Sequence, residues 1–297
     1  MISDAPPTGT VTDARGRVSG LAGRVPPESL FVCGAISQYV GSAVAVLLFA
    51  HVPPAGVAWL RGLSASCALV AWRRPWHSAW TARRLLLVAA FGLALALMNL
   101  CFYLAIDRLP LGTTVAIEFL GPITVVAVGS RTRRDAVALV LATAGVLTLA
   151  GIHASATPAG VALALAAGAF WSVYILLGHR VASDPRIRPQ DGLAAGMALG
   201  VIGLAPVLIG PASPALRSAP LLAACVAVGL ASSVVPYSLD QVAMRRLTRA
   251  RFALLLSLLP ATAAIVGAVI LGQVPGLPEA GGIALVVLAF SLRSHPG

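Results

Sequence analysis

Two ionisable residues, Arg61 and Glu118, lie deep inside apolar stretches of the chain. A charged side chain in hydrocarbon costs about 3 kcal/mol or more unless it is paired or faces water, so each is a candidate functional residue. Arg61 follows Pro53 by eight residues, and Glu118 follows Pro110 by the same interval. Eight helical residues rise about 12 Å, so we expect both side chains to reach one level.

Two interpretations of this pair remain open. In one, Arg61 and Glu118 form a structural ion pair, and removal of either partner would cost about 3–5 kcal/mol. In the other, Glu118 is the site of a proton or a substrate amine, and Arg61 adjusts its charge state. The two interpretations overlap, since an ion pair can also be part of a transport site.

Three prolines are expected to break helices near these residues. Pro122 lacks the N–H that would bond the Glu118 carbonyl, so the helix should bend there and direct carbonyl and carboxylate into one cavity. Pro236 frees the Ser232 carbonyl in the same way, and Pro260 frees the carbonyl four residues before it. The alternative is that each proline only bends its helix.

Further polar and aromatic residues lie at mid-span. Asn99 and Tyr103, four residues apart, share one helix face, while Trp171, Tyr174 and Tyr237 occupy later spans. Such amphipathic groups are able to line a wet pocket and orient a small zwitterion. The alternative is hydrogen bonding between helices without a ligand.

Asp240 is a candidate gate residue. It precedes Arg245 by five residues, near the inner end of its span. It would close the inner mouth by pairing with Arg245 or Arg246, or it would only cap that end against solvent.

The rest of the chain must place these side chains in a bilayer. Its 297 residues are 58% hydrophobic and 10% charged. Ten apolar stretches are long enough, or nearly so, to cross about 30 Å of hydrocarbon. We predict ten transmembrane helices near 30–50, 54–72, 85–106, 111–129, 136–152, 159–179, 192–210, 219–242, 252–272 and 277–292. The fold class is therefore an all-α membrane protein.

The arginines predict the orientation. Eighteen of them lie before the first span or in alternate connections, namely 73–84, 130–135, 180–191, 243–251 and after 292. Positively charged connections stay in the cytoplasm, so both termini are expected inside. The net charge of +11 follows from topology, and with no lysine and few aromatic residues we predict no nucleic-acid partner.

The spans divide into two inverted repeats of five helices. The segment from Phe102 aligns with the segment from Asp240, which pairs Pro122 with Pro260, and GAISQY from Gly34 is similar to GAFWSVY from Gly168. We expect a disordered cytoplasmic tail at 1–29, repeats at 30–152 and 153–293, and a short tail at 294–297. Inverted repeats are common in secondary transporters, with the site at midplane between the halves.

Three segments resemble a known family. MNLCFYLAIDRLPLGTTVAIEFLGP, GAFWSVYILLGHR and VVPYSLDQVAMRRL are similar to helices of the bacterial threonine and homoserine exporters, in the EamA branch of the drug/metabolite transporter superfamily. The resemblance covers about residues 30–293. It implies ten helices in two inverted five-helix repeats and export of small metabolites, driven by the proton gradient.

The second half departs from that family pattern. Leu258-Leu259-Pro260 replaces Met-Glu-Pro, and Gly272-Gln273 replaces Gly-Glu. One intramembrane acid is therefore missing, which leaves the substrate and the coupling stoichiometry open.

Other functions have less support. The four cysteines and five histidines lack the spacing of a metal site, and no DDxxD, HExxH or phosphate loop is present, so we predict no enzyme, metal or cofactor.

We predict a proton-coupled exporter of amino acids or related polar metabolites in the bacterial inner membrane, using alternating access, with lipid and protons as partners. The alternatives are another cargo, such as a drug-like amphiphile or a nucleobase, or an intramembrane enzyme; the oligomeric state is unknown.

Overall fold

A computed structural model of the chain describes residues 26–77, 80–129, 132–153, 157–244, 246–247 and 249–294. Within these residues every regular element is a helix, as the sequence predicts. The first helix begins at Pro27, three residues earlier than expected. Proline suits the first turn of a helix because the N–H that it lacks would have no intrahelical partner. Most of the predicted N-terminal tail lies outside the described residues.

Helices occupy all ten predicted ranges. Seven ranges hold one uninterrupted helix: α2 (Pro27–Leu48), α3 (Pro54–Arg73), α4 (Ala82–Ile106), α7 (Arg133–His153), α8 (Pro158–Ser183), α9 (Pro189–Leu216) and α14 (Leu277–Ser294). Three ranges hold interrupted helices: α5 (Leu111–Glu118) with α6 (Leu120–Gly129), α10 (Ala219–Gly229) with η2 (Leu230–Val234) and α11 (Val235–Met244), and α12 (Arg249–Leu256) with α13 (Leu259–Leu271).

Many of these helices have the length and composition of membrane spans. In the described part of the chain, seven segments are long and apolar enough to cross a bilayer: α2, α3, α4, α8, α9, Ala219–Leu239 and Leu254–Leu271. The apolar helices Leu111–Val125 and Leu277–Leu292 are shorter. An α-helix satisfies its own backbone hydrogen bonds, which is what a segment in lipid requires.

Each interruption lies just before a proline. The α5–α6 helix breaks at Phe119, three residues before Pro122, and the α12–α13 helix breaks at Ser257, three residues before Pro260. In the α10–α11 helix, a π-helical turn ends two residues before Pro236. A proline removes one intrahelical hydrogen bond, and the preceding turn rearranges in response.

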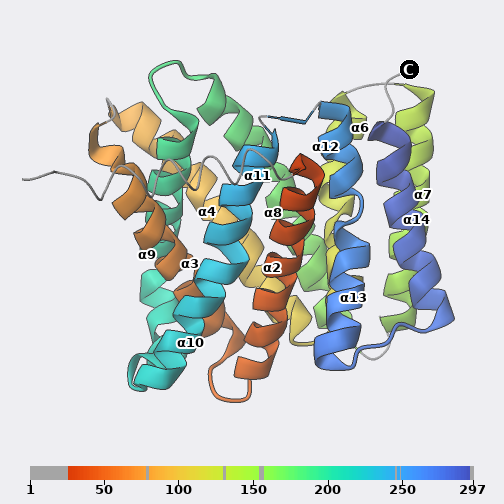
Figure 1. Ribbon diagram of the computed structural model, residues 1–297, viewed down its shortest axis with the longest axis horizontal. Coiled ribbons are helices and arrows are strands. Elements are labelled where there is room, and N and C mark those ends of the chain that lie inside the picture. The colour runs from red at the N-terminus through yellow and green to blue at the C-terminus, as the bar shows by residue number, and fades with distance from the viewer. Residues whose placement is uncertain are drawn as a thin grey trace, which may run out of the picture.

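The helices pack as one bundle, with elements from the two halves of the sequence side by side. Figure 1 shows α7 and α14 together at one end and α3 and α9 at the other, and these pairs are in extensive contact. Near the middle, α4 packs on α8 and α2 packs on α11, while α5 contacts α13. This packing brings residues of the two halves together at the centre.

Candidate functional site

Arg61 lies on α3 and is only 6% exposed. Its Nε donates a hydrogen bond to Ser232 Oγ (2.7 Å), and its Nη2 donates to the Ser232 carbonyl (3.0 Å). Its Nη1 donates to Asn99 Oδ1 on α4. The guanidinium therefore connects two helices of the first half to a residue of the second half.

Ser232 can receive Arg61 because its backbone is irregular. Pro236 lacks the N–H that would bond the Ser232 carbonyl in an α-helix, and the π-helical turn η2 surrounds this position. The Ser232 hydroxyl donates to the Val228 carbonyl at 2.6 Å, which orients its oxygen toward Arg61. Nearby, Ser37 Oγ donates to the Ala231 carbonyl at 2.7 Å. Side chains thus satisfy backbone acceptors that the irregular turn exposes.

Gly229 sets the approach of η2 to α3. A Cβ at this position would lie 1.9 Å from Ser64 Oγ and 2.7 Å from the Arg61 carbonyl oxygen. A side chain here would therefore push the two backbones apart, and only glycine permits the short Arg61–Ser232 contacts.

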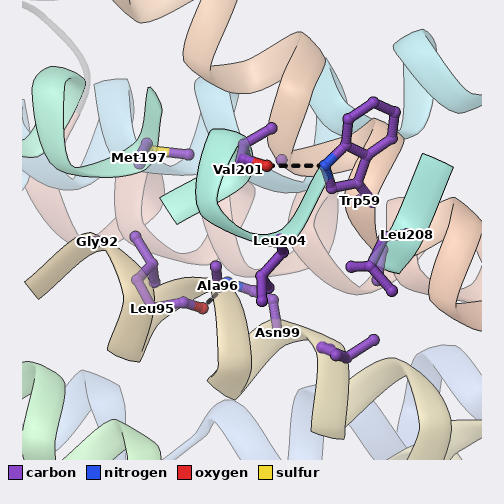
Figure 2. A pocket seen from close by; sticks show the side chains of 12 residues that line it. Trp59, Gly92, Leu95, Ala96, Asn99, Met197, Val201, Leu204 and Leu208 are labelled. Carbon is purple, nitrogen blue, oxygen red and sulfur yellow. Dashed lines mark hydrogen bonds between the residues drawn. The ribbon is translucent and has the colours of Figure 1, made fainter. Parts of the chain in front are cut away.

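Asn99 fixes the other side of the guanidinium. Its Nδ2 donates to the Leu95 carbonyl at 2.8 Å, so its Oδ1 is directed to Arg61. Asn99 also lines a small, mostly apolar pocket between α3, α4 and α9 (Figure 2). In the same pocket, Trp59 Nε1 donates to the Val201 carbonyl at 2.9 Å. The pocket therefore reaches the polar cluster at Asn99.

Tyr103 completes the cluster. Arg61 Cζ lies 5.4 Å from the centre of the Tyr103 ring, in the range of a cation–π interaction. The tyrosine is fully buried, and its hydroxyl lies near the side chains of Ser42 and Ser232 but forms no hydrogen bond of good geometry among the described residues. Such unsatisfied buried groups are rare and often mark a place for water, an ion or a ligand.

Glu118 is buried at the end of α5, but the expected ion pair is not formed. Within the described residues no carboxylate pairs with Arg61, although Glu118 is close enough for the two charges to interact. The three nitrogens of Arg61 bind neutral oxygens of Asn99 and Ser232 instead. The structural ion-pair interpretation is therefore wrong for this conformation.

The Glu118 carbonyl lies close to α8. A Cβ on Gly168 would lie 2.6 Å from this oxygen, so the carbonyl packs against the α8 backbone, and its sharing of a cavity with the carboxylate stays a prediction. Trp171, one turn along α8, meets the Phe119 ring edge-on at 5.0 Å. Trp171 thus packs against the helix break that lies beside Glu118.

The other two tyrosines predicted for the site, Tyr174 and Tyr237, form a group of their own. Tyr174 stacks on Phe91 with ring centroids 4.8 Å apart and an interplanar angle of 20°. Tyr237 and Tyr174 pack in one apolar cluster with Met98 and Leu193. The structure therefore groups the predicted residues into an Arg61–Asn99–Tyr103 cluster, a Glu118–Trp171 region and a Tyr174–Tyr237 region.

The break before Pro260 and the candidate gate Asp240 are the last two predicted features. At the second break, before Pro260, Ser257 Oγ donates to the Leu254 carbonyl at 2.6 Å, and Ser291 Oγ donates to Ser257 Oγ at 2.9 Å. Asp240 belongs to α11, but its side chain and Arg245 lie outside the described part of the structure. The gate therefore stays a prediction.

Gln273, at the position where the family pattern suggested glutamate, accepts a hydrogen bond that fixes the start of another helix. Its Oε1 accepts a hydrogen bond from the Leu111 N–H at 2.9 Å, at the start of α5. Gly272 before it has φ of 68°, a left-handed conformation that ends α13 and favours glycine. An amide oxygen caps a helix N-terminus as a carboxylate does, so this contact does not need the acid.

Ser232 and Gly229 are the residues that sequence reasoning missed. A polar residue four positions before a mid-span proline is the sequence signal for Ser232. That signal predicts a free carbonyl but not a role for the hydroxyl. Together the cluster offers one buried guanidinium, neutral acceptors and a buried phenol. A guanidinium fork of this kind is suited to binding a carboxylate.

Comparisons with known proteins show to which proteins the chain is similar. The EamA-like transporter family matches residues 158–294. The threonine/homoserine exporter RhtA of Salmonella typhimurium strain LT2 is 36% identical over 238 residues, which cover 78% of this chain and 79% of that protein. The Escherichia coli K12 exporter of the same name is 35% identical over the same length and coverage. A protein of known crystal structure matches with a TM-score of 0.54 at 20% identity, covering 90% of this chain and 96% of that one, which shows the fold alone.

Proposed function

Because the chain belongs to the EamA-like transporter family, and is thus a multi-pass membrane transporter, we propose that it exports small amino acids such as threonine and homoserine. The proposed setting is the bacterial inner membrane, with ten spans in two inverted repeats, 30–152 and 153–293, and both termini in the cytoplasm. The relationship to exporters named for these two amino acids is the observation that carries the proposal.

The packing supports the inverted repeat. Spans with equivalent positions in the two halves pack on each other: α3 on α9, α5 on α13, and α7 on α14. The helix breaks at Phe119 and Ser257 also lie at equivalent positions, since both precede the aligned prolines by three residues. A pseudo-twofold axis in the membrane plane would produce both features.

The Arg61 cluster is the proposed carboxylate site. Asn99 and Ser232 hold the guanidinium through neutral oxygens, so an incoming α-carboxylate would be a stronger acceptor than either. The Tyr103 hydroxyl, which forms no hydrogen bond of good geometry within the described residues, would donate a further hydrogen bond to that ligand. Because Arg61 links the two halves, exchange of Ser232 for substrate would also loosen a contact between them, which is one step of alternating access.

Glu118 is the proposed proton site. It is a buried acid whose charge interacts with Arg61, and no side chain of the described residues forms an ion pair with it. Protonation on the outer side and release on the inner side would couple export to the proton gradient.

Inside-out vesicles from cells that produce the protein would test this function. We expect radiolabelled threonine and homoserine to accumulate in the vesicles when the lumen is acidic, and an uncoupler to abolish the accumulation. Vesicles without the protein are the control. The amino-acid assignment would be overturned if the vesicles took up neither amino acid. Another cargo would replace it if production of the protein protected growing cells only against an amphiphile or a nucleobase.

A further inference from the structure

A second, positively charged cleft lies between the N-terminal end of α4 and the C-terminal end of α8. We call it the arginine cleft, after the four arginines that line it, Arg83, Arg84, Arg180 and Arg186. It is separate from the Arg61 cluster, and it opens at the surface of the bundle, since three of these arginines are exposed. The positive-inside rule places this end of the helices in the cytoplasm.

One carboxylate, Asp184, lies among the lining residues of this cleft, and its oxygens are already occupied. Asp184 Oδ1 accepts a hydrogen bond from the Arg186 backbone N–H, and Oδ2 accepts from Arg84 Nε, both at 2.9 Å. These bonds hold the pKa of Asp184 below its ordinary value, chiefly through the Arg186 N–H. Asp184 is therefore ionised at neutral pH and balances one of the four arginines.

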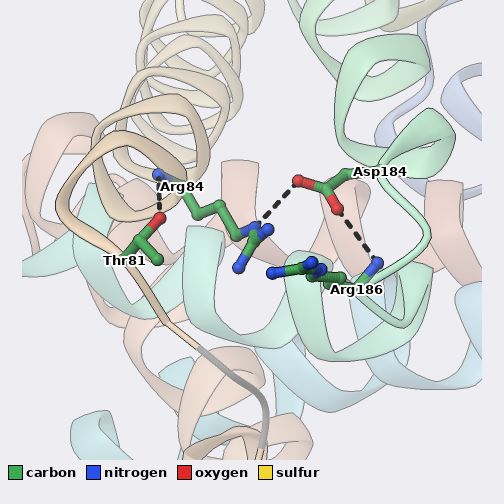
Figure 3. A network of polar contacts seen from close by, with 4 residues as sticks. All are labelled: Thr81, Arg84, Asp184 and Arg186. Atoms are coloured by element: carbon green, nitrogen blue, oxygen red, sulfur yellow. Dashed lines mark hydrogen bonds and ion pairs between the residues drawn. The ribbon is translucent and has the colours of Figure 1, made fainter.

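The other three arginines carry charge that Asp184 does not balance. Figure 3 shows the Arg186 side chain extending toward the Arg84 guanidinium. In the described part of the chain, the side chains of Arg83, Arg180 and Arg186 form no ion pair. Guanidinium groups that line one cleft without carboxylate partners are suited to a phosphate, which accepts several charge-assisted hydrogen bonds.

The wall of the cleft is apolar where α4 continues toward the membrane. Leu86 and Leu87 line the cleft together with Ala90, and Leu86 is 72% exposed. In a membrane-spanning helix, such a leucine faces lipid chains. Along α4 the charged part of the cleft is followed by apolar surface. A phospholipid has the same order, with a charged headgroup followed by acyl chains.

We propose that the arginine cleft binds the headgroup phosphate of an anionic phospholipid, with an acyl chain along Leu86. Basic pockets between transmembrane helices recognise lipid headgroups through this chemistry. Since α4 and α8 belong to different halves of the sequence, the bound lipid would join the two halves at this end of the bundle.

Binding of dioleoyl phosphatidylglycerol to the detergent-purified full chain, measured by native mass spectrometry, tests the proposal. We expect it to bind more tightly than dioleoyl phosphatidylcholine. The double variant Arg180→Gln/Arg186→Gln should weaken binding roughly 30-fold, the factor that two such charges contribute near an anionic surface. It leaves the Arg84–Asp184 bond and the Arg186 backbone N–H in place.

The matched control, Arg133→Gln/Arg134→Gln, removes the same charge from another connection and should bind like the wild type. Both variants are first compared with the wild type for elution volume and melting temperature without lipid. Equal loss in both double variants would show general attraction and overturn the proposal. Equal binding of phosphatidylcholine would overturn it as well, and displacement of the lipid by glycerol phosphate at a similar concentration would assign the cleft to a soluble anion.

Discussion

Arg61 and Ser232, which are 171 residues apart, are joined by two hydrogen bonds of 2.7 and 3.0 Å. One acceptor is the serine hydroxyl, and the other is the backbone carbonyl that Pro236 leaves without its helical donor. The contact joins the two halves of the sequence at a buried position. Any rearrangement that separates the halves must therefore break or replace these bonds.

Ser232→Ala removes the hydroxyl and keeps the carbonyl. A hydrogen bond to a charged group contributes about 1.5–3 kcal/mol, so we expect transport to fall at least about tenfold as Arg61 loses its position. Initial rates of threonine uptake into inside-out vesicles measure this loss. Ser66→Ala is the control, because Ser66 is also buried but donates only to Leu63 on its own helix, and it should transport normally. Equal effects of the two substitutions would remove the hydroxyl from the mechanism.

Glu118→Gln preserves shape and removes the acid that we propose to carry the proton. We expect this variant to insert in the membrane at normal levels and to lose uptake driven by an acidic lumen. Exchange of labelled for unlabelled threonine without a gradient separates the two roles, since a variant that cannot release a proton should still exchange. Full gradient-driven transport by Glu118→Gln would exclude Glu118 from coupling.

Gly168→Ala tests the close packing of α8 on the broken helix. The new Cβ would lie 2.6 Å from the Glu118 carbonyl oxygen, which belongs to the backbone and has little freedom to move. Overpacking of this kind costs about 1–3 kcal/mol, so the melting temperature should fall by several degrees. Gly203→Ala is the matched control, because nothing lies within 4 Å of a Cβ there. A melting temperature for Gly168→Ala equal to that of the control would show that α8 is free to shift.

The outcome of sequence reasoning differed between backbone and side chains. The helix ranges followed from apolar length, since spans in lipid have few alternatives to a helix. The Ser232 carbonyl was predicted to be free for the same local reason, the proline four residues later. The donor that binds this carbonyl was not predictable. The contact with Arg61 depends on how closely η2 approaches α3, and Gly229 decides that distance.

The pairing of Arg61 with Glu118 failed for a related reason. Equal depth along two helices says how far each residue lies from the surface, but not which way its side chain points around the helix axis. Neutral oxygens of Asn99 and Ser232 were closer to the guanidinium than the acid. Tyr174 shows the same limit, since its apolar partner, the Phe91 ring on which it stacks, does not follow from its depth in the membrane.

Substitutions of Gln273 test whether the glutamate of the family pattern is needed at this position. Gln273→Glu keeps an acceptor for the Leu111 N–H and should fold and transport like the wild type. Gln273→Leu removes the acceptor, and loss of a helix cap costs about 0.5–2 kcal/mol, so its melting temperature should fall. A change in the proton dependence of transport in Gln273→Glu would show that the acid has a coupling role as well.

The Asp184 carboxylate predicts a pH dependence of stability at the arginine cleft. Its pKa is lower in the folded protein than its ordinary value, because the Arg186 N–H and Arg84 Nε stabilise the carboxylate. A lowered folded pKa means that the stabilisation is present above the unfolded value of about 3.9 and is lost as the pH falls through the folded value. We therefore expect Asp184→Asn to melt below the wild type at pH 7, and the difference to shrink below about pH 4. Melting curves of both proteins between pH 3 and pH 8 measure it, and a difference that grows in acid would contradict the assignment.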